Sequence, residues 1–150
     1  MAWNRTVGRW AWLLALVPVL LAVPLVAGRR HGPQPAGTPV KVRLADFRVR
    51  PDRASVPAGA VRFDLVNNGP STHELIVVRT DRTPGRLPLQ RDGLTVDEEA
   101  PGLHALDEAE GLDIADHRTL LLRLPPGHYV LFCNMEGHYL GGMHAALTVG

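Results

Sequence analysis

The chemically reactive side chains of this chain are concentrated in one short stretch, FCNMEGHYLGGMH, at residues 132–144. The stretch contains Cys133, which is the only cysteine of the 150 residues, and two of the three methionines. His138 follows Cys133 by five residues, and Met143 follows His138 by five. A thiolate, an imidazole and a thioether are soft or borderline ligands that suit copper better than calcium or magnesium. The stretch therefore predicts a copper site on a glycine-rich loop.

An electron-transfer copper centre has two histidines and one cysteine in a trigonal arrangement, with a weak axial methionine. One histidine would have to come from outside the stretch, and His73 is the best candidate. It begins the apolar run HELIVV, directly after the turn NNGPST. Each residue also has a purely structural interpretation: Cys133 as a small buried side chain, Met143 as core packing and His73 as a strand histidine. Together, these separate interpretations are weaker than a single metal site.

Composition and charge exclude several other classes of protein. One cysteine excludes an intrachain disulfide, a zinc site with three or four cysteines and an iron–sulfur cluster held by four thiolates of one chain. Four of the 16 basic residues lie at or before Arg30 and all 15 acidic residues follow it, so the later part has 12 basic against 15 acidic residues, a net charge of −3. No basic stripe remains there, and nucleic-acid binding is therefore disfavoured.

Residues 1–30 predict a signal peptide or an N-terminal membrane anchor. A basic lead with Arg5 and Arg9 precedes WAWLLALVPVLLAVPLVA, residues 10–27, which carry no charge. This pattern is typical of both kinds of segment. Arg29 and Arg30 follow at once, which favours an uncleaved anchor. Residues 31–39 then form a Pro/Gly linker, and the rest of the chain is expected in the periplasm or on the outer face of the cytoplasmic membrane.

Residues 40–150 predict an all-β domain. Short runs of alternating or apolar residues are separated by turns rich in Pro and Gly, such as ASVPAGA and LPPGHY. Six or more short strands in a domain of this length favour an antiparallel β-sandwich. The expected strands cover residues 40–49, 61–69, 73–80, 119–124, 127–134 and 144–150.

Residues 81–118 interrupt this pattern and are expected to form a long acidic insertion. The sequence DEEAPGLHALDEAEGLDIAD within it is only weakly periodic. Leu103, Leu106 and Ala109 could share one face of a short helix, although Pro101 and Gly102 disturb its start. The acidity fits a solvated surface, and the alternative is a docking patch for a basic partner.

Three segments resemble the cupredoxin family of small blue copper proteins: FCNMEGHYLGGMHAALTVG, PPGHYV before it and VPAGAVRFDLVNNGPSTHELIVV upstream. The resemblance covers residues 40–80 and 118–150. Four residues separate Cys133 from His138, and four separate His138 from Met143, which resembles rusticyanin and sulfocyanin more than plastocyanin. The resemblance implies a Greek-key β-sandwich and one type 1 copper ion bound by His73, Cys133 and His138, with Met143 as the axial ligand. It also implies one-electron transfer as the activity.

The residue after the first ligand histidine departs from the better-known cupredoxins, in which it is often Asn or Ser. Here it is Glu74, whose carboxylate could accept backbone N–H groups and tie the two ligand-bearing loops together. Strand alternation turns His73 and Leu75 to one side and Glu74 to the other, which favours this supporting role. Asn134, next to Cys133, is likewise expected to support the ligands without binding the metal. The alternative is that Glu74 approaches the metal and gives a centre that is not blue.

Electron transfer by Cu(I)/Cu(II) cycling needs no substrate pocket, so neither an enzyme nor a small-molecule substrate is expected. The His-x-His pairs of multicopper oxidases and the methionine clusters typical of copper delivery are both absent from the sequence, although copper binding and delivery stays the alternative function. Redox proteins are expected as electron donor and acceptor in a small, transient contact. His144 is expected to lie at the surface, away from the metal. By resemblance, the docking patch around His138 would consist of Tyr139, Leu140, Gly141 and Gly142.

Overall fold

The computed structural model describes residues 36–150. The predicted signal peptide or anchor (residues 1–30) and most of the predicted linker (residues 31–39) lie outside the described residues. Among residues 36–150, no helix is both long and apolar enough to cross a membrane.

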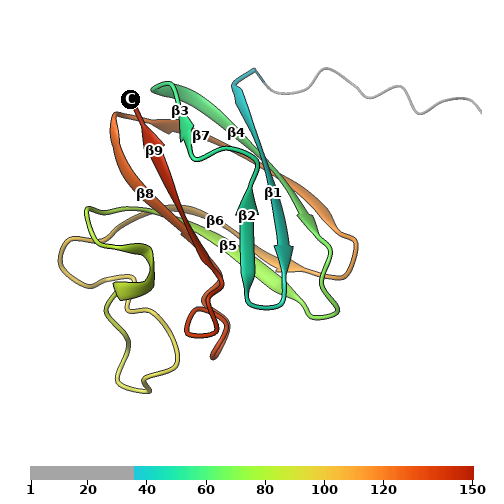
Figure 1. Ribbon diagram of the computed structural model, residues 1–150, viewed down its shortest axis with the longest axis vertical. Coiled ribbons are helices and arrows are strands. Elements are labelled where there is room, and N and C mark those ends of the chain that lie inside the picture. The colour runs from blue at the N-terminus through green and yellow to red at the C-terminus, as the bar shows by residue number, and fades with distance from the viewer. Residues whose placement is uncertain (1–35) are drawn as a thin grey trace, which may run out of the picture. The chain divides into compact units, whose positions relative to one another are not determined.

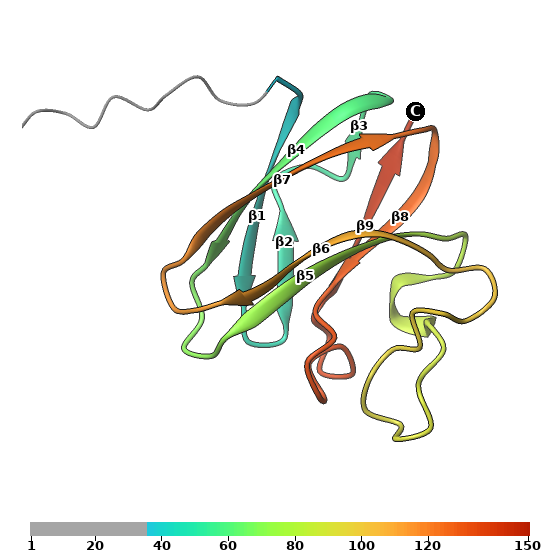
Figure 2. The same cartoon turned by 180° about the vertical axis from the view of Figure 1, so that it is seen from behind.

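Two β-sheets pack face to face as a sandwich (Figures 1 and 2). The four-stranded sheet has the order β2-β1-β4-β7, and the five-stranded sheet has the order β3-β9-β8-β5-β6. The all-β prediction is confirmed, but the sheets are mixed, because β1 pairs with β4 and β3 with β9 in parallel. The strands are β1 (Thr38–Ala45), β2 (Arg48–Pro51), β3 (Ser55–Val56), β4 (Gly59–Asn67), β5 (His73–Arg79), β6 (His104–Leu112), β7 (His117–Leu124), β8 (Gly127–Phe132) and β9 (His144–Val149).

Alternation of side chains along the strands explains the core. In β4, Val61, Phe63 and Leu65 are buried, whereas Arg62 and Asp64 between them are partly exposed and pair with each other. Successive side chains of a strand point to opposite faces, so one face of β4 meets the other sheet and one meets water. The apolar residues that the two sheets turn toward each other form one buried cluster, which also contains Cys133 and Met143.

The first predicted strand, residues 40–49, is divided into two strands. β1 ends at Ala45, β2 begins at Arg48, and these two residues are opposite each other in an antiparallel pair. Phe47 lies between them with a φ of 60°, in the left-handed region that reverses the chain. The β1–β2 turn lies at the same end of the sandwich as residues 133–143 (Figures 1 and 2).

The short helix predicted within residues 81–118 is wrong. His104–Leu112 forms β6, which pairs with β5 at the edge of the five-stranded sheet. Leu103 and Ala109 are buried, but Leu106 is exposed. The backbone groups along the edge of β5 need hydrogen-bond partners, and this pairing overrides a weak helical periodicity.

The segment between β5 and β6 packs against the five-stranded sheet instead of extending into solvent. It contains the 3₁₀-helix η1 (Pro84–Arg86). Three of its apolar residues, Leu87, Val96 and Leu103, lie in a second buried cluster, separate from the main core, on the side of β5 that carries Ile76 and Val78. The strand β5 is therefore covered on both faces, which explains its nearly continuous apolar run. The cluster consists of Ile76, Val78, Leu87, Val96, Leu103, Val130, Phe132 and Tyr139.

Candidate metal centre

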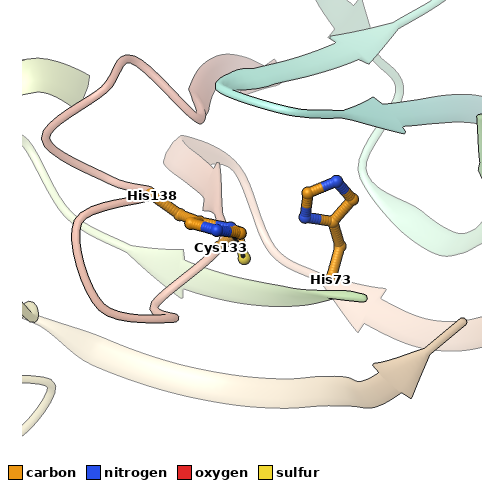
Figure 3. A group of neighbouring side chains, drawn as sticks. All are labelled: His73, Cys133 and His138. Carbon is orange, nitrogen blue, oxygen red and sulfur yellow. Dashed lines mark hydrogen bonds between the residues drawn. The ribbon is translucent and has the colours of Figure 1, made fainter. Parts of the chain in front are cut away.

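Three elements bring His73, Cys133 and His138 together at one end of the sandwich. His73 is the first residue of β5, Cys133 directly follows β8, and His138 lies in the loop between β8 and β9. One possible ligand atom from each residue lies within 4.8 Å of the other two. Figure 3 shows the three side chains converging on one point from these separate segments. His73 and Cys133 are buried, and His138 is partly exposed.

The His73 ring is fully buried, and neither of its nitrogens has a hydrogen-bond partner among the described residues. One nitrogen is turned toward Cys133 and His138 in Figure 3, and the other is turned away. Nε2 lies 3.2 Å from Oδ1 of Asp46, a close contact without hydrogen-bond geometry. Burial lowers the pKa of His73, and a positive charge on His138 would lower it further, whereas Asp46 acts in the opposite direction. These conditions favour a neutral imidazole, which is the form that binds metal.

Cys133 is fully buried, and its Sγ lies 3.5 Å from Nδ1 of His138. Burial raises the pKa of the Cys133 thiol, while hydrogen bonds from the backbone N–H groups of Glu74 and Met135 act in the opposite direction. A buried thiol with a raised pKa is a poor nucleophile in the absence of a metal. A bound cation would favour the thiolate, because metal binding releases the thiol proton.

Met143 is fully buried in the same cluster as Cys133. Its backbone N–H donates to the carbonyl of His138 at 3.1 Å, and its carbonyl accepts from the N–H of Cys133 at 3.1 Å. These bonds close residues 133–143 into a compact loop, called the ligand loop from here on. Met143 as the axial ligand stays a prediction, and its burial beside Cys133 is compatible with that role.

Glu74 contacts the ligand loop in the way expected of a supporting residue. Its Oε1 accepts the backbone N–H of Asn134 at 2.8 Å, which ties the start of β5 to the residue after Cys133. Burial raises the pKa of Glu74, and the negative charges of Glu98, Glu108 and Glu110 raise it further, whereas the Asn134 N–H lowers it. Glu74 is absent from the group of possible ligand atoms formed by His73, Cys133 and His138, which favours the supporting role over a direct role at the metal.

The rim around His138 differs from the predicted docking patch at one residue. Leu140 is 51% exposed, as a docking patch requires. Tyr139 is only 3% exposed, so its predicted place in the patch is wrong. The Tyr139 hydroxyl points inward because it donates to the Pro84 carbonyl at 2.6 Å and accepts the Leu87 N–H at 2.8 Å. Gly141 is exposed, and Gly142 is partly exposed.

Two residues of the β1–β2 turn belong to the site and were not predicted from the sequence. Asp46 contacts His73, as described above. Phe47 is 51% exposed and packs its ring edge-on against His138, with ring centroids 5.8 Å apart. A Cβ atom at Gly141 would overlap Cδ1 of Phe47, so this glycine permits the contact. No spacing relates the turn to the ligand loop, and an exposed aromatic residue in a turn was the only local signal.

His144, which was predicted to lie at the surface, is less exposed than expected. It is partly buried, with its ring 5.3 Å from that of Tyr139, and burial lowers its pKa. His144 is absent from the group formed by His73, Cys133 and His138, so the structure gives it no place among the ligand atoms.

The side chains at this end of the sandwich fit a copper ion. Two imidazoles, a thiol and a nearby buried methionine form a soft donor set. The unpaired nitrogens of His73 are a second sign, because buried polar groups normally have a partner. Gly69 adds a third, since a Cβ atom there would lie 2.9 Å from Nε2 of His73 and disturb the ring.

The chain is similar to known proteins in sequence and in fold. The sequence model of the sulfocyanin (SoxE) domain matches residues 53–150, whereas no curated protein sequence matches the chain. The fold is similar to reduced auracyanin from the photosynthetic bacterium Roseiflexus castenholzii, with 20% identity over 77% of this chain and 98% of that chain, at a TM-score of 0.55.

Two further solved structures have the same fold. Auracyanin B is 25% identical over 80% of this chain and 93% of its own, with a TM-score of 0.54. Reduced rusticyanin is 16% identical over 77% of this chain and 81% of its own, with a TM-score of 0.53. Because the sulfocyanin match covers most of the chain and includes His73 and the whole ligand loop, the chain belongs to the sulfocyanin family of cupredoxins.

Proposed function

We propose that this protein carries single electrons between redox partners by means of one type 1 copper ion. His73, Cys133 and His138 would hold the ion, and Met143 would be its weak axial ligand. The observation that supports this proposal most directly is that ligand atoms of two histidines and the single cysteine lie within 4.8 Å of one another. When bound, copper supplies a one-electron couple between Cu(I) and Cu(II) in such a site.

The three proposed ligands differ in exposure and therefore in role. His73 and Cys133 are buried and shield the site from water, which keeps its surroundings apolar. His138 is the partly exposed member, so it offers the shortest route from the site to the surface. Phe47, whose ring packs against His138, and Leu140, two residues after it in the chain, are exposed apolar side chains. We propose that they, with Gly141 and Gly142, form the docking surface. Such redox contacts are usually small and transient.

The proposed partners are redox proteins that act as electron donor and acceptor outside the cytoplasm. The uncharged stretch at residues 10–27 supports export and attachment to the membrane. An attached domain would meet membrane-bound partners at a high effective concentration. Neither an enzymatic activity nor a small-molecule substrate is part of the proposal.

The first experiment is to add one equivalent of Cu(II) to the purified full-length protein in detergent and record its visible absorption and EPR spectra. We expect an intense blue band and a narrow copper hyperfine splitting, because both arise from a short copper–thiolate bond. A weakly coloured complex with an ordinary hyperfine splitting would contradict the proposal. It would instead favour oxygen ligands, with Glu74 or water at the metal, and copper handling as the function.

A further inference from the structure

The ligand loop has a backbone that would be flexible in isolation. It includes three glycines, of which Gly137 has a φ of 76° and Gly142 a φ of 103°. Glycine has more conformational freedom than any other residue, so a loop of this composition has much entropy to lose on ordering. Contacts from the rest of the fold must therefore restrict it if its ligands are to remain in place.

One segment, residues 84–98, contacts the ligand loop at three points, Asn134, Gly137 and Tyr139. At the beginning, the Asn134 side chain accepts the N–H of Val96 and donates to the Val96 carbonyl at 3.1 Å and to Glu98 Oε1 at 2.8 Å. In the middle, the Gly137 N–H donates to the Leu94 carbonyl at 3.2 Å. These bonds run between segments about 40 residues apart, so they join two separate parts of the chain.

Tyr139 makes the third connection, after His138. Its hydroxyl bonds both Pro84 and Leu87, and its ring packs edge-on against Phe132, with centroids 5.8 Å apart. Tyr139 also lies in the second apolar cluster with Leu87 and Val96. Figures 1 and 2 both show the yellow-green segment beside the red ligand loop.

The segment has internal order of its own. Leu89 and Val96 form an antiparallel bridge, and the Gln90 N–H donates to the Thr95 carbonyl at 2.8 Å. Asp92 accepts from the N–H of Leu94 at 2.8 Å, which fixes the turn. These internal bonds give the segment an order that does not depend on its contacts with the ligand loop.

We propose that residues 84–98 form a brace that holds the ligand loop in its metal-binding conformation before any metal arrives, with Asn134 and Tyr139 as its positioning residues. The identity of the metal rests on the proposed function, but the brace does not depend on it. The brace gives residues 84–98 a role in the site, although they supply none of the predicted ligands. It also means that metal binding need not order the loop.

Hydrogen exchange of the full-length protein without copper tests the brace. Tyr139→Phe keeps the ring but removes both hydroxyl hydrogen bonds, and we expect amides of the ligand loop to exchange about tenfold faster. The matched control is Tyr129→Phe. Tyr129 is equally buried and its hydroxyl donates to the Pro125 carbonyl at 2.7 Å, away from the ligand loop. Unchanged exchange in Tyr139→Phe, or equal acceleration by both variants, would overturn the proposal.

Asn134→Ala provides a second test in case Tyr139→Phe does not fold. It removes the connection to Val96 and Glu98 and leaves the second apolar cluster in place, so we expect faster exchange in the ligand loop again. After addition of Cu(II), both variants should show a broader spread of EPR parameters than the wild type, which Tyr129→Phe should not. If the wild type binds no copper, the exchange measurements still decide whether the brace exists, which separates this proposal from the proposed function.

Discussion

At the scale of single residues, the three proposed ligands differ in how the fold holds them. His73 is fixed by the start of β5 and Cys133 by the end of β8, whereas His138 depends on the ligand loop. Cys133 has the least replaceable chemistry, because its thiolate is the expected source of the blue colour.

We therefore predict that Cys133→Ser abolishes the intense blue band and leaves a folded protein. The serine hydroxyl is close in size to the thiol but is a poor ligand for copper. Visible absorption measures the colour, and circular dichroism checks the fold. A variant that kept the blue band would show that Cys133 is not a ligand.

Met143→Leu should retain copper and raise the reduction potential, because the axial donor that tunes the potential is lost. Leucine has nearly the same volume, so the stability of the buried site should fall by less than about 1.5 kcal/mol. Protein-film voltammetry measures the potential. Complete loss of copper would mean that Met143 is more than a weak axial ligand.

Asp46→Asn should also raise the reduction potential. The carboxylate lies 3.2 Å from Nε2 of His73, and a negative charge there stabilises Cu(II) more than Cu(I). Asp64→Asn is the control, because it removes the same charge from the outer face of the four-stranded sheet, where Asp64 pairs with Arg62. Equal shifts in the two variants would show that the contact with His73 has no special effect.

At the scale of elements, the site depends on two connections that meet beside His73. The β1–β2 turn supplies Asp46, and the β4–β5 connection supplies Gly69. The Asn67 side chain orders the second connection, because it accepts the Gly69 N–H at 2.9 Å and donates to the carbonyls of Ser71 at 2.7 Å and Leu112 at 2.9 Å. Close packing of these two connections leaves little room at Gly69.

We expect Gly69→Ala to destabilise the protein by about 1–3 kcal/mol, as overpacking of a buried site commonly does. The added Cβ would lie 2.9 Å from Nε2 of His73 and 3.0 Å from Cα of Ala45, so the copper EPR spectrum should change as well. Gly85→Ala is the control, since its Cβ would meet only the His144 ring, at 3.3 Å. Urea unfolding of both variants gives the comparison, and equal stabilities would contradict the packing argument.

At the scale of the whole molecule, side chains of like charge are neighbours on both sheets. The outer face of the four-stranded sheet carries the exposed residues Lys41, Arg43 and Arg50. Arg43 on β1 is directly opposite Arg50 on β2. The edge strand β6 carries exposed Asp107 and Glu108 instead. Burial and the neighbouring acidic residues raise the pKa of Glu108. Like charges placed this close make the stability of the fold sensitive to pH.

The buried histidines should make the copper-free protein less stable in acid. Burial lowers the pKa values of His73 and His144 below the ordinary value of 6.5. Below pH 6.5 the unfolded chain therefore binds protons that the folded chain does not, so the free energy of unfolding falls as the pH falls through this range. The raised pKa of Glu74 acts in the opposite sense, because its contribution to stability is lost as the pH rises above 4.5.

His144→Gln isolates the histidine effect because the carboxylates are unchanged. Its melting temperature should decline less between pH 7 and pH 5 than that of the wild type. His117→Gln removes an exposed histidine instead and serves as the control. Differential scanning calorimetry at several pH values makes the comparison, and parallel curves for His144→Gln and the wild type would contradict the prediction.

Most of the strands and the spacing of the ligands could be predicted from the sequence, because both are local properties. Alternating side chains identified β4, an apolar run between turn residues identified β8, and the five-residue intervals from Cys133 to His138 and from His138 to Met143 indicated a soft metal site. His73 was identified from its place at the start of an apolar strand. Its position among the three grouped residues agrees with that prediction.

Contacts between distant segments could be decided only by the tertiary structure. Residues 104–112 became β6 because the edge of β5 offers backbone partners, and Tyr139 points inward because Pro84 and Leu87 bind its hydroxyl. Asp46 and Phe47 reach the two histidines because the β1–β2 turn lies at the same end of the sandwich. The sequence by itself determined which side chains could bind a metal. The surroundings of those side chains depend on which segments pack together, and residue spacing contains no measure of that packing.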